Sequence, residues 1–275
     1  MSARSQGVAR RTTGDLLAFA LLACGAVIVL TPLAWMISTS LKDPGKIYLY
    51  PPQWIPDPVR WETYAHVLTQ WPFLTYLRNT FIITTLSIFG SVFSSALVAY
   101  SFARLRWRYR DFFFLVCLAT MMLPPQVTPV PTFILFVKLG WLDSFLPLTV
   151  PAFFGQAFYI FMLRQFFRTL PRSLDEAALI DGCGYLRIFT QIVLPLARPA
   201  VLAVAIFTFM AAWNDFMGPL IYLSSEHKRT LALALAFFSS NFFSGIHTHT
   251  LMAASLIVML PCIAIFFVFQ RQFIS

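Results

Sequence analysis

The sequence predicts an all-α integral membrane protein with six transmembrane helices and with both termini in the cytoplasm. Hydrophobic residues make up 59% of the 275 residues and charged residues only 11%, against the roughly 25% charged residues of soluble domains. The apolar residues form runs of about 20 or more, the length that a helix needs to cross the hydrocarbon core. These runs lack the alternation of apolar and polar residues that a membrane β-strand would show.

Six apolar runs are long enough to span the membrane. They lie near residues 15–38, 73–102, 111–138, 146–168, 196–222 and 250–270. Lipid offers the backbone no hydrogen-bond partner, so each run is expected to be helical. The chain 1–275 is therefore interpreted as a single transmembrane domain.

The first run decides whether the N-terminal segment is retained. Three arginines precede an apolar run that begins at Leu16, as in a signal peptide, and residues 21–24 resemble a lipoprotein cleavage box. The run continues to Ile37, which is longer than the apolar core of a cleavable signal. We therefore expect a retained first transmembrane helix.

Basic residues indicate the orientation, because Lys and Arg accumulate in cytoplasmic loops. Thirteen of the 20 basic residues lie on one side of the predicted spans and seven on the other, where five acids offset most of them. The richer side includes the N-terminus, residues 104–110, the residues that flank the fourth and fifth spans, and Arg271. We assign this side to the cytoplasm. Topology thus accounts for the net charge of +9, no nucleic-acid partner is expected, and binding of anionic membrane lipid by residues 104–110 is a secondary role.

The cytoplasmic segment between the fourth and fifth spans, residues 173–193, has the composition of an ordered structure. Ser173 and Glu176 have the spacing of a capping box, which favours a helix that begins there. Gly182 and Gly184 permit a sharp turn, and a second apolar helix is expected from about Tyr185. The segment is therefore predicted to be a rigid helix–turn–helix knob.

The residues of this knob resemble the EAA loop of permease subunits of ABC importers. The match comprises Glu176-Ala177-Ala178, then Gly182 after three residues, and then Ile192-Val193-Leu194-Pro195 after nine more. In that family the loop contains the coupling helix, which docks in a cleft of the ATPase subunit. The resemblance implies a type I permease fold. It also assigns ATPase coupling to the following residues: Glu176, Ala177, Ala178, Asp181, Gly182, Ile192, Leu194 and Pro195.

The resemblance extends over most of the chain and points to the carbohydrate-uptake branch of these permeases, like the second permease of maltose-type and glycerol-phosphate-type importers. It is carried by residues 121–126, by Leu139-Gly140-Trp141-Leu142 and by Trp213-Asn214-Asp215-Phe216, where the branch more often has Glu than Asp. The implied partners are a second homologous permease, an ATPase homodimer and an extracytoplasmic solute-binding protein, in the bacterial inner membrane. Because the chain has no GxxxxGK[ST] loop, ATP and Mg are expected on the ATPase, and this chain is expected to be a transport subunit without a cofactor.

Polar residues inside the predicted spans are the candidates for the translocation pathway. Asp215 is the clearest, because a carboxylate costs about 2.5–3.5 kcal/mol at the bilayer centre and must face the bundle or the pore. Asn214, Asn79, Gln126 and Gln156 are further candidates. Hydrogen bonding between neighbouring helices is the alternative for all five. No metal site is expected, since the pair of histidines at 247 and 249 lacks a third ligand at a recognisable spacing.

Other classes of membrane protein fit the sequence less well. An ion-coupled secondary transporter would typically show inverted repeats, broken helices and several intramembrane acids, whereas Asp215 is the single clear acid. A membrane-embedded enzyme would need convergent catalytic residues, and neither a metalloprotease His-Glu pair nor a nucleophile elbow occurs. An ABC importer for a non-sugar solute stays open as an alternative, because the carbohydrate class rests on resemblance. The sequence does not identify the sugar.

Overall fold

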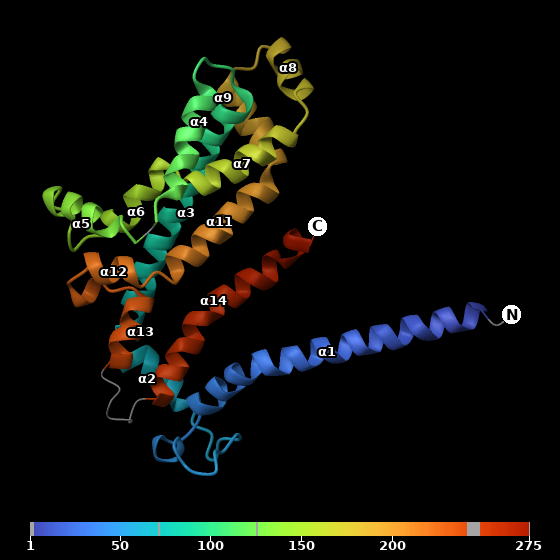
Figure 1. Cartoon of the computed structure of the whole chain (residues 1–275). Helices are drawn as coiled ribbons and strands as arrows, with labels where there is room; N and C mark the ends of the chain where they lie inside the picture. Colours follow the sequence, from blue (N-terminus) through green and yellow to red (C-terminus); the bar gives the residue numbers. More distant parts are fainter. Residues whose placement is uncertain (1–2, 71, 125, 241–247, 275) are drawn as a thin grey trace. The chain divides into compact units, whose positions relative to one another are not determined.

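The computed structural model describes residues 3–70, 72–124, 126–240 and 248–274, and within these ranges all regular elements are helices (Figure 1). The predicted all-α class is therefore confirmed. Four helices are long and apolar enough to cross a membrane, and a bent pair raises the number to five. The chain forms two compact units, Met1–Trp71 with Phe238–Leu260 and Pro72–Phe237 with Pro261–Ser275. The six-span topology and the cytoplasmic termini stay predictions.

The first unit contains the long N-terminal helix α1, Ala3–Ser40, which covers the predicted first span. A loop with the short helix η1, Pro44–Lys46, leads from it to α2, Glu62–Gln70, which the sequence analysis did not predict. The ammonium of Lys42 lies 3.7 Å from the centre of the Trp35 ring, and the Trp54 ring packs edge-on against Trp35 at 5.0 Å. These contacts fold the proline-rich loop back onto the end of α1.

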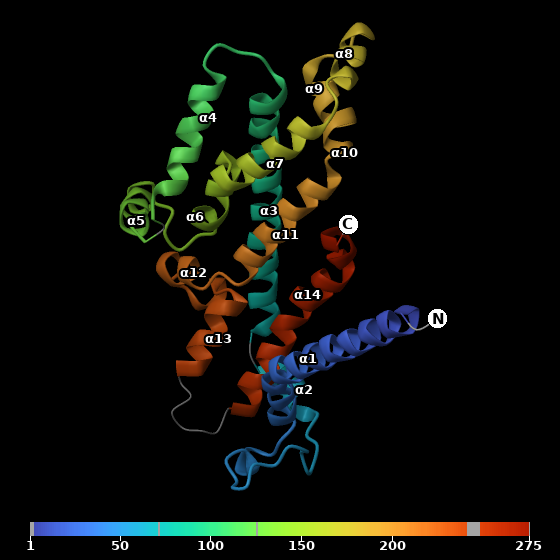
Figure 2. The ribbon, with the colours of Figure 1, turned by 45° about the vertical axis from the view of Figure 1, so that its right-hand side comes forward.

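The second unit is built around α3, Phe73–Arg104, which packs against α7, Ala157–Thr169, and α11, Arg198–Trp213 (Figure 2). Small side chains make the contact face of α3, so the neighbouring backbones can approach closely, as is typical of helix pairs in membranes. Buried large side chains from α7 and α11 fill the remaining space. The buried residues of this contact include Ser95, Ala96, Ala99, Ala103, Leu163, Phe167 and Val204.

The predicted third span, residues 111–138, is broken. It consists of α4, Arg110–Ala119, the single turn η2, Thr120–Met122, and α5, Pro129–Lys138. Pro124 lacks the amide hydrogen that a continuing helix would need, while Pro129 suits the first turn of α5. This run is consequently not among the helices that are long enough to span a membrane on their own.

The predicted fourth and fifth spans are interrupted as well, although Leu146–Thr169 as a whole is one of the four stretches that are long and apolar enough to cross a membrane. The run 146–168 comprises α6, Leu146–Thr149, η3, Val150–Phe154, and α7, with a break at residues 155–156. The run 196–222 comprises α11 and α12, Met217–Tyr222, with a break at residues 214–216. At its start, α11 is bent by 80° from the helical segment Tyr185–Leu196. Continuous hydrophobicity therefore did not mean a continuous helix.

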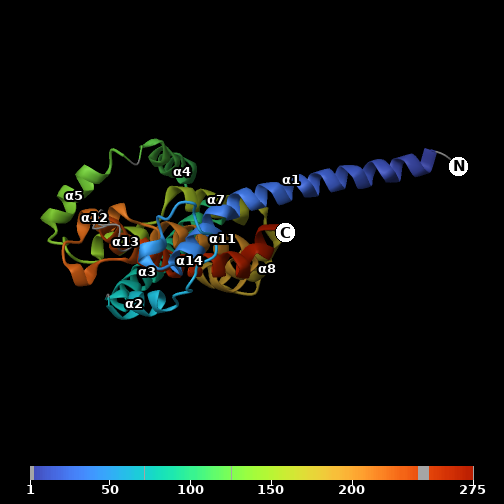
Figure 3. The same ribbon diagram turned by 90° about the horizontal axis from the view of Figure 1, so that it is seen from below.

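The chain continues from α12 through η5, Glu226–Lys228, into α13, Leu231–Ser240, a helix that the sequence analysis treated as part of a loop. Helix α12 lies beside α5 (Figure 3), where the Tyr222 ring contacts Phe133 at 6.4 Å and Phe136 at 5.3 Å. The last helix, α14, Thr248–Ile274, contains the predicted sixth span 250–270.

Candidate coupling segment and pathway residues

The predicted knob begins with helix α8, Ser173–Ile180, which ends in a glycine turn. Gly182 has φ +78°, a conformation that residues with a Cβ rarely adopt. The Gly182 amide donates to Leu179 O at 3.1 Å, and the Cys183 amide donates to Ala178 O at 2.8 Å. This bond pair is the Schellman motif, with glycine at the position that needs it. The spacing from Glu176 to Gly182 thus encodes one short helix and its terminus.

The predicted capping box does not form. Arg172 occupies the N-cap position and makes no side-chain capping bond, so Ser173 is already the first helical residue. A capping side chain must come from the N-cap residue, one position before the helix begins. Ser173 lies inside the helix, so its hydroxyl does not cap it. The start of α8 is held instead by an ion pair with a distant helix.

Arg104, the last residue of α3, anchors α8. Its Nε lies 2.8 Å from Oδ2 of Asp175, and its Nη2 donates to Oδ1 at 3.2 Å. The same guanidinium donates to Leu170 O at 2.8 Å and to Pro171 O at 3.0 Å. Because the Arg104 side chain is only 3% exposed, these contacts are shielded from water and from screening by salt. Helix α8 is therefore coupled directly to α3.

The second half of the knob is helical from Tyr185, as predicted, but it is not a regular α-helix. It consists of α9, Tyr185–Ile188, the π-helical turn η4, Phe189–Val193, and α10, Leu194–Leu196. Phe189 is buried and its ring lies 5.0 Å from the Tyr100 ring of α3. The Tyr100 hydroxyl donates to Tyr185 O at 3.2 Å. This half of the knob is thus also fastened to α3.

The predicted coupling residues divide into two groups. The exposed group forms one surface with Leu179 and with Ile180, which is 86% exposed; its members are Glu176, Ala177, Asp181 and Gly182. The second group faces the unit itself: Ala178 is buried, and Ile192 and Leu194 pack against the core. Leu194 and Pro195 line an apolar hollow of about 550 Å³ together with Phe89 and Phe93 of α3. The first group is exposed, while the second contacts other residues of the same unit.

No hydrogen bond joins any two of the five predicted pathway residues, all of which the structure describes. Asn79 is buried, and its amide donates to His227 O at 2.8 Å and to Arg229 O at 3.0 Å. Asn214 donates to Met210 O at 2.8 Å, within its own helix. Asp215 accepts from the Gly218 amide at 3.1 Å. Gln126 and Gln156 are exposed.

Four of these five residues nevertheless share one feature, because they lie at helix breaks: Gln126, Gln156, Asn214 and Asp215. The break at residues 155–156 and the nearby helix α6 both contact α3. The Ser95 hydroxyl of α3 accepts from the backbone amide of Gln156 at 3.3 Å, and the Ser87 hydroxyl donates to Leu148 O at 3.3 Å. Leu148 in turn packs so closely on Gly218 that a Cβ there would overlap it. At membrane depth, irregular backbone is tolerated only where protein buries it or where it lines a water-filled cavity.

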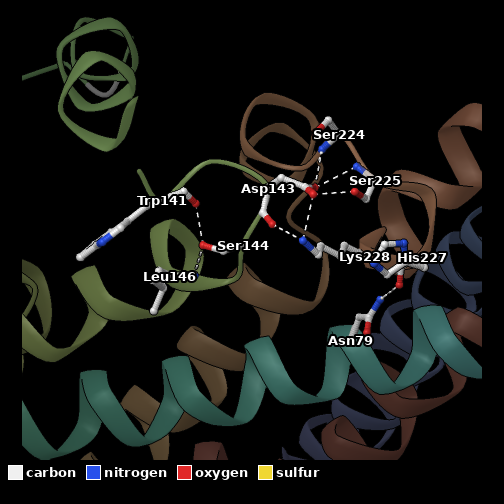
Figure 4. Close-up of polar contacts among 9 residues, drawn as sticks. All are labelled: Asn79, Trp141, Asp143, Ser144, Leu146, Ser224, Ser225, His227 and Lys228. Atoms are coloured by element: carbon white, nitrogen blue, oxygen red, sulfur yellow. Dashed lines mark hydrogen bonds and ion pairs between the residues drawn. The ribbon is translucent and has the colours of Figure 1, made fainter. Parts of the chain in front are cut away.

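A polar network at the other end of α3 was not identified from the sequence (Figure 4). Asp143 lies between α5 and α6 with φ +53°. Its carboxylate accepts from the Ser224 amide at 3.1 Å, the Ser225 amide at 2.9 Å and Lys228 Nζ at 2.9 Å. The Asn79 side chain of α3 donates to the carbonyl of His227, next to Lys228 (Figure 4). We call these residues, Asn79, Asp143, Ser225 and Lys228, the outer brace.

The bonds of the outer brace favour the charged form of Asp143. The Ser225 hydroxyl and amide, followed by the Lys228 ammonium, hold the pKa of the Asp143 carboxyl well below its usual range. In the sequence Asp143 and Lys228 counted only as opposite charges in two separate loops. Their separation of 85 residues left no local signal for the pairing.

The outer brace and the Arg104 anchor lie near opposite ends of α3. Asn79 and Arg104 are 25 residues apart in one helix. At about 1.5 Å per residue they are separated by about 38 Å, which exceeds the roughly 30 Å of a bilayer's hydrocarbon core. A membrane-spanning α3 therefore carries one of these sites at each face of the membrane.

Comparisons with known proteins give a consistent result. Residues 91–275 match the family described as binding-protein-dependent transport system inner membrane component. The diacetylchitobiose uptake system permease protein NgcG of Streptomyces coelicolor is 36% identical over 255 residues, covering 92% of this chain and 84% of that protein. The sn-glycerol-3-phosphate transport system permease protein UgpE of Yersinia enterocolitica is 31% identical, with 94% of each chain covered.

A solved structure has the same fold. It is a bacterial ABC transporter involved in the import of the acidic polysaccharide alginate, and it superposes with a TM-score of 0.81 over 96% of this chain and 97% of that chain. The sequence identity is 24%, so this likeness concerns the fold alone.

Proposed function

Since this chain belongs to the family of inner membrane components of binding-protein-dependent transport systems, we propose that it forms one half of the translocation pathway of an ATP-driven sugar importer in the bacterial inner membrane. The other half is a second, homologous permease. Two ATPase subunits bind the cytoplasmic face, and an extracytoplasmic protein delivers the solute. Both termini of this chain lie in the cytoplasm.

The observation that carries this proposal is the construction of the coupling segment. Helix α8 presents Glu176, Ala177 and Ile180 outward, while the Arg104–Asp175 pair joins its base to α3. A partner that moves α8 therefore moves α3, because the Arg104 guanidinium is buried and makes several hydrogen bonds to Asp175 and to the chain before α8. Closure of the ATPases on ATP would pull residues 173–193 as one lever and open the permease toward the outside. Hydrolysis of the ATP would then reset the inward-open state.

The broken helices support a pathway beside the middle of α3. Breaks at residues 155–156 and 214–216 place irregular backbone and polar side chains there. Asn214 and Asp215 are the best candidates to line the pathway, because both are polar residues at the break in the predicted fifth span. Asn79 is engaged in the outer brace, so its contribution is to position the loop that carries His227.

The substrate class rests on the relatives. Their names record diacetylchitobiose and sn-glycerol-3-phosphate as solutes. Both solutes are rich in hydroxyl groups, and hydroxyl-bearing ligands are recognised by hydrogen-bonding side chains such as those at the helix breaks. We therefore propose an oligosaccharide or a related polyol derivative as the solute of this chain.

The decisive experiment is reconstitution with the ATPase. The permease pair and the ATPase are co-expressed, purified together and placed in liposomes that contain the binding protein. Glu176→Lys reverses the charge of the exposed acid in the first turn of α8. We expect this variant to insert normally, to lose ATPase co-purification and to lose sugar uptake.

A matched variant separates docking from folding. Glu226→Lys reverses an exposed acid in η5, away from the coupling segment, and it should leave ATPase binding unchanged. If Glu176→Lys retained the ATPase and supported normal uptake, the coupling assignment would be abandoned.

A further inference from the structure

The loop that follows α3 lines a polar hollow of about 360 Å³. Arg172, the residue before α8, also lines the hollow. Four arginines face it against a single acid, Asp111; they are Arg106, Arg108, Arg110 and Arg172. The hollow therefore has a surplus of positive charge.

The acid of the hollow is already occupied. Asp111 Oδ1 lies 3.0 Å from Arg110 Nε and 3.7 Å from Arg164 Nη2. Within the described part of the chain, no carboxylate lies at ion-pair distance from Arg106, Arg108 or Arg172. These three guanidinium groups are available to an anion from outside the chain.

Aromatic and apolar side chains adjoin this charge. Trp107 is 38% exposed and Tyr109 is 55% exposed, and both line the hollow. Such rings settle at the level of lipid headgroups. Directly beyond them, α4 exposes large apolar side chains such as Phe112 and Leu115, which suit contact with hydrocarbon. A ligand with an anionic head and an apolar tail matches both surfaces, whereas an acidic protein surface matches the arginines alone.

The hollow also touches the coupling segment. Arg172 borders α8, and Arg104, two residues before Arg106, holds Asp175 of the same helix. Figure 2 shows the loop after α3 and α8 at the same end of α3. An anion bound between Arg108 and Arg172 would join the loop to the start of α8.

We propose that this hollow binds the headgroup of an anionic phospholipid of the cytoplasmic leaflet, and that the bound lipid steadies α8 against the end of α3. The proposal rests on the cytoplasmic placement given in the proposed function. Coupling would then require a bound lipid, which membership of the family does not by itself imply.

The test measures lipid binding to the full-length permease. The chain is placed in phosphatidylcholine nanodiscs, phosphatidylglycerol is titrated in, and bound phosphatidylglycerol is counted by native mass spectrometry. A basic residue near an anionic membrane surface typically contributes enough for about a 5-fold change in affinity. Arg108→Gln with Arg172→Gln should therefore weaken binding about 30-fold, and the single change Arg108→Gln about 5-fold.

Arg187→Gln is the matched control. It removes one positive charge from the same segment, but Arg187 bonds to Gln191 at 2.9 Å and does not line the hollow. Its phosphatidylglycerol binding should equal that of the wild type. The single variant keeps the test decisive if the double variant fails to insert.

Two results would overturn the proposal. The first is equal phosphatidylglycerol binding by the wild type and by Arg108→Gln. The second is unchanged lipid binding by the arginine variants with loss of ATPase co-purification, which would assign the hollow to the ATPase. Lipid binding is measured on the permease alone, and ATPase binding is measured by a separate co-purification. A failure of the proposed function is thereby distinguished from a failure of the lipid site.

Discussion

Asp215 shows how one side chain can serve a break in a membrane helix. Its carboxylate accepts from the Gly218 amide at 3.1 Å, which satisfies a backbone donor that no preceding helical turn reaches. Gly218 lies so close to Asp215 and Leu148 that any larger residue would displace them. At this scale the residue has a structural role in addition to the proposed role in the pathway.

Substitutions at Asp215 separate these two roles. Asp215→Ala removes the acceptor and should lower the free energy of unfolding by about 1–2 kcal/mol, as the loss of a capping side chain does. Asp215→Asn keeps an oxygen acceptor and should keep the stability, while sugar uptake falls if the charge serves the pathway. Thermal melting and uptake in liposomes give the two readings. Normal uptake with Asn at this position would remove the proposed pathway role of the charge.

Asp143 makes the outer brace sensitive to pH. Its carboxyl has a lower pKa in the folded chain than the usual 3.8, so the folded chain binds fewer protons between the two values and stability rises with pH there. The stabilisation is complete above the usual pKa and is lost as the pH falls through the lower pKa of the folded chain.

Asp143→Asn tests this dependence. Asn tolerates the positive φ of this position, so the change removes the charge with little backbone strain. We expect a lower melting temperature at neutral pH and a weaker decline of stability in acid. Asp57→Asn, in an exposed loop position, is the control and should melt as the wild type does at every pH. Identical pH profiles for Asp143→Asn and the wild type would contradict the brace.

At the scale of elements, α8 and its glycine turn form the part that meets the ATPase in the proposed function. Two glycines lie in this turn, and only Gly182 has a positive φ; Gly184 has φ −73°. An added Cβ would meet nothing within 4 Å at either position. The two glycines therefore differ in backbone conformation and not in available space.

This difference gives a matched pair of variants. Gly182→Ala should destabilise the turn by about 1–2 kcal/mol and reduce the sugar transported per ATP hydrolysed, because the end of α8 is no longer held in place. Gly184→Ala should change neither quantity appreciably. The ATPase rate and the uptake are measured on the same preparation of each variant, which gives the sugar transported per ATP hydrolysed. Equal coupling in both variants would show that the left-handed conformation of Gly182 is dispensable.

The Arg104–Asp175 pair is the second connection of this element. Asp175→Asn leaves a buried guanidinium without its counter-charge, a change that commonly costs about 3–5 kcal/mol. We expect ATP hydrolysis to continue without uptake, since α8 could then move independently of α3. Asp175→Glu, which keeps the charge, should restore part of the uptake. Full coupling in Asp175→Asn would exclude the pair as the link between α8 and α3.

At the scale of the whole molecule, the proposed topology can be checked by labelling. In a chain with its four cysteines replaced by serine, a cysteine is placed at Ile180 or at Tyr50, which are 86% and 94% exposed. A membrane-impermeant thiol reagent should reach position 50 from outside whole cells and position 180 only in inverted vesicles. Labelling of both positions from the same side would contradict the orientation derived from the basic residues.

The sequence by itself determined the helical class, the apolar runs and the short helix that ends at Gly182, because these depend on composition and on spacings of a few residues. It did not reveal where the long runs break, although Pro124 was a local sign of one break. Only the tertiary structure decided that Asn79 serves the outer brace, that Arg104 holds Asp175 across 71 residues, and that Asp143 binds Lys228 across 85. Such pairings depend on how α3 packs against the other helices, and no local pattern encodes that packing.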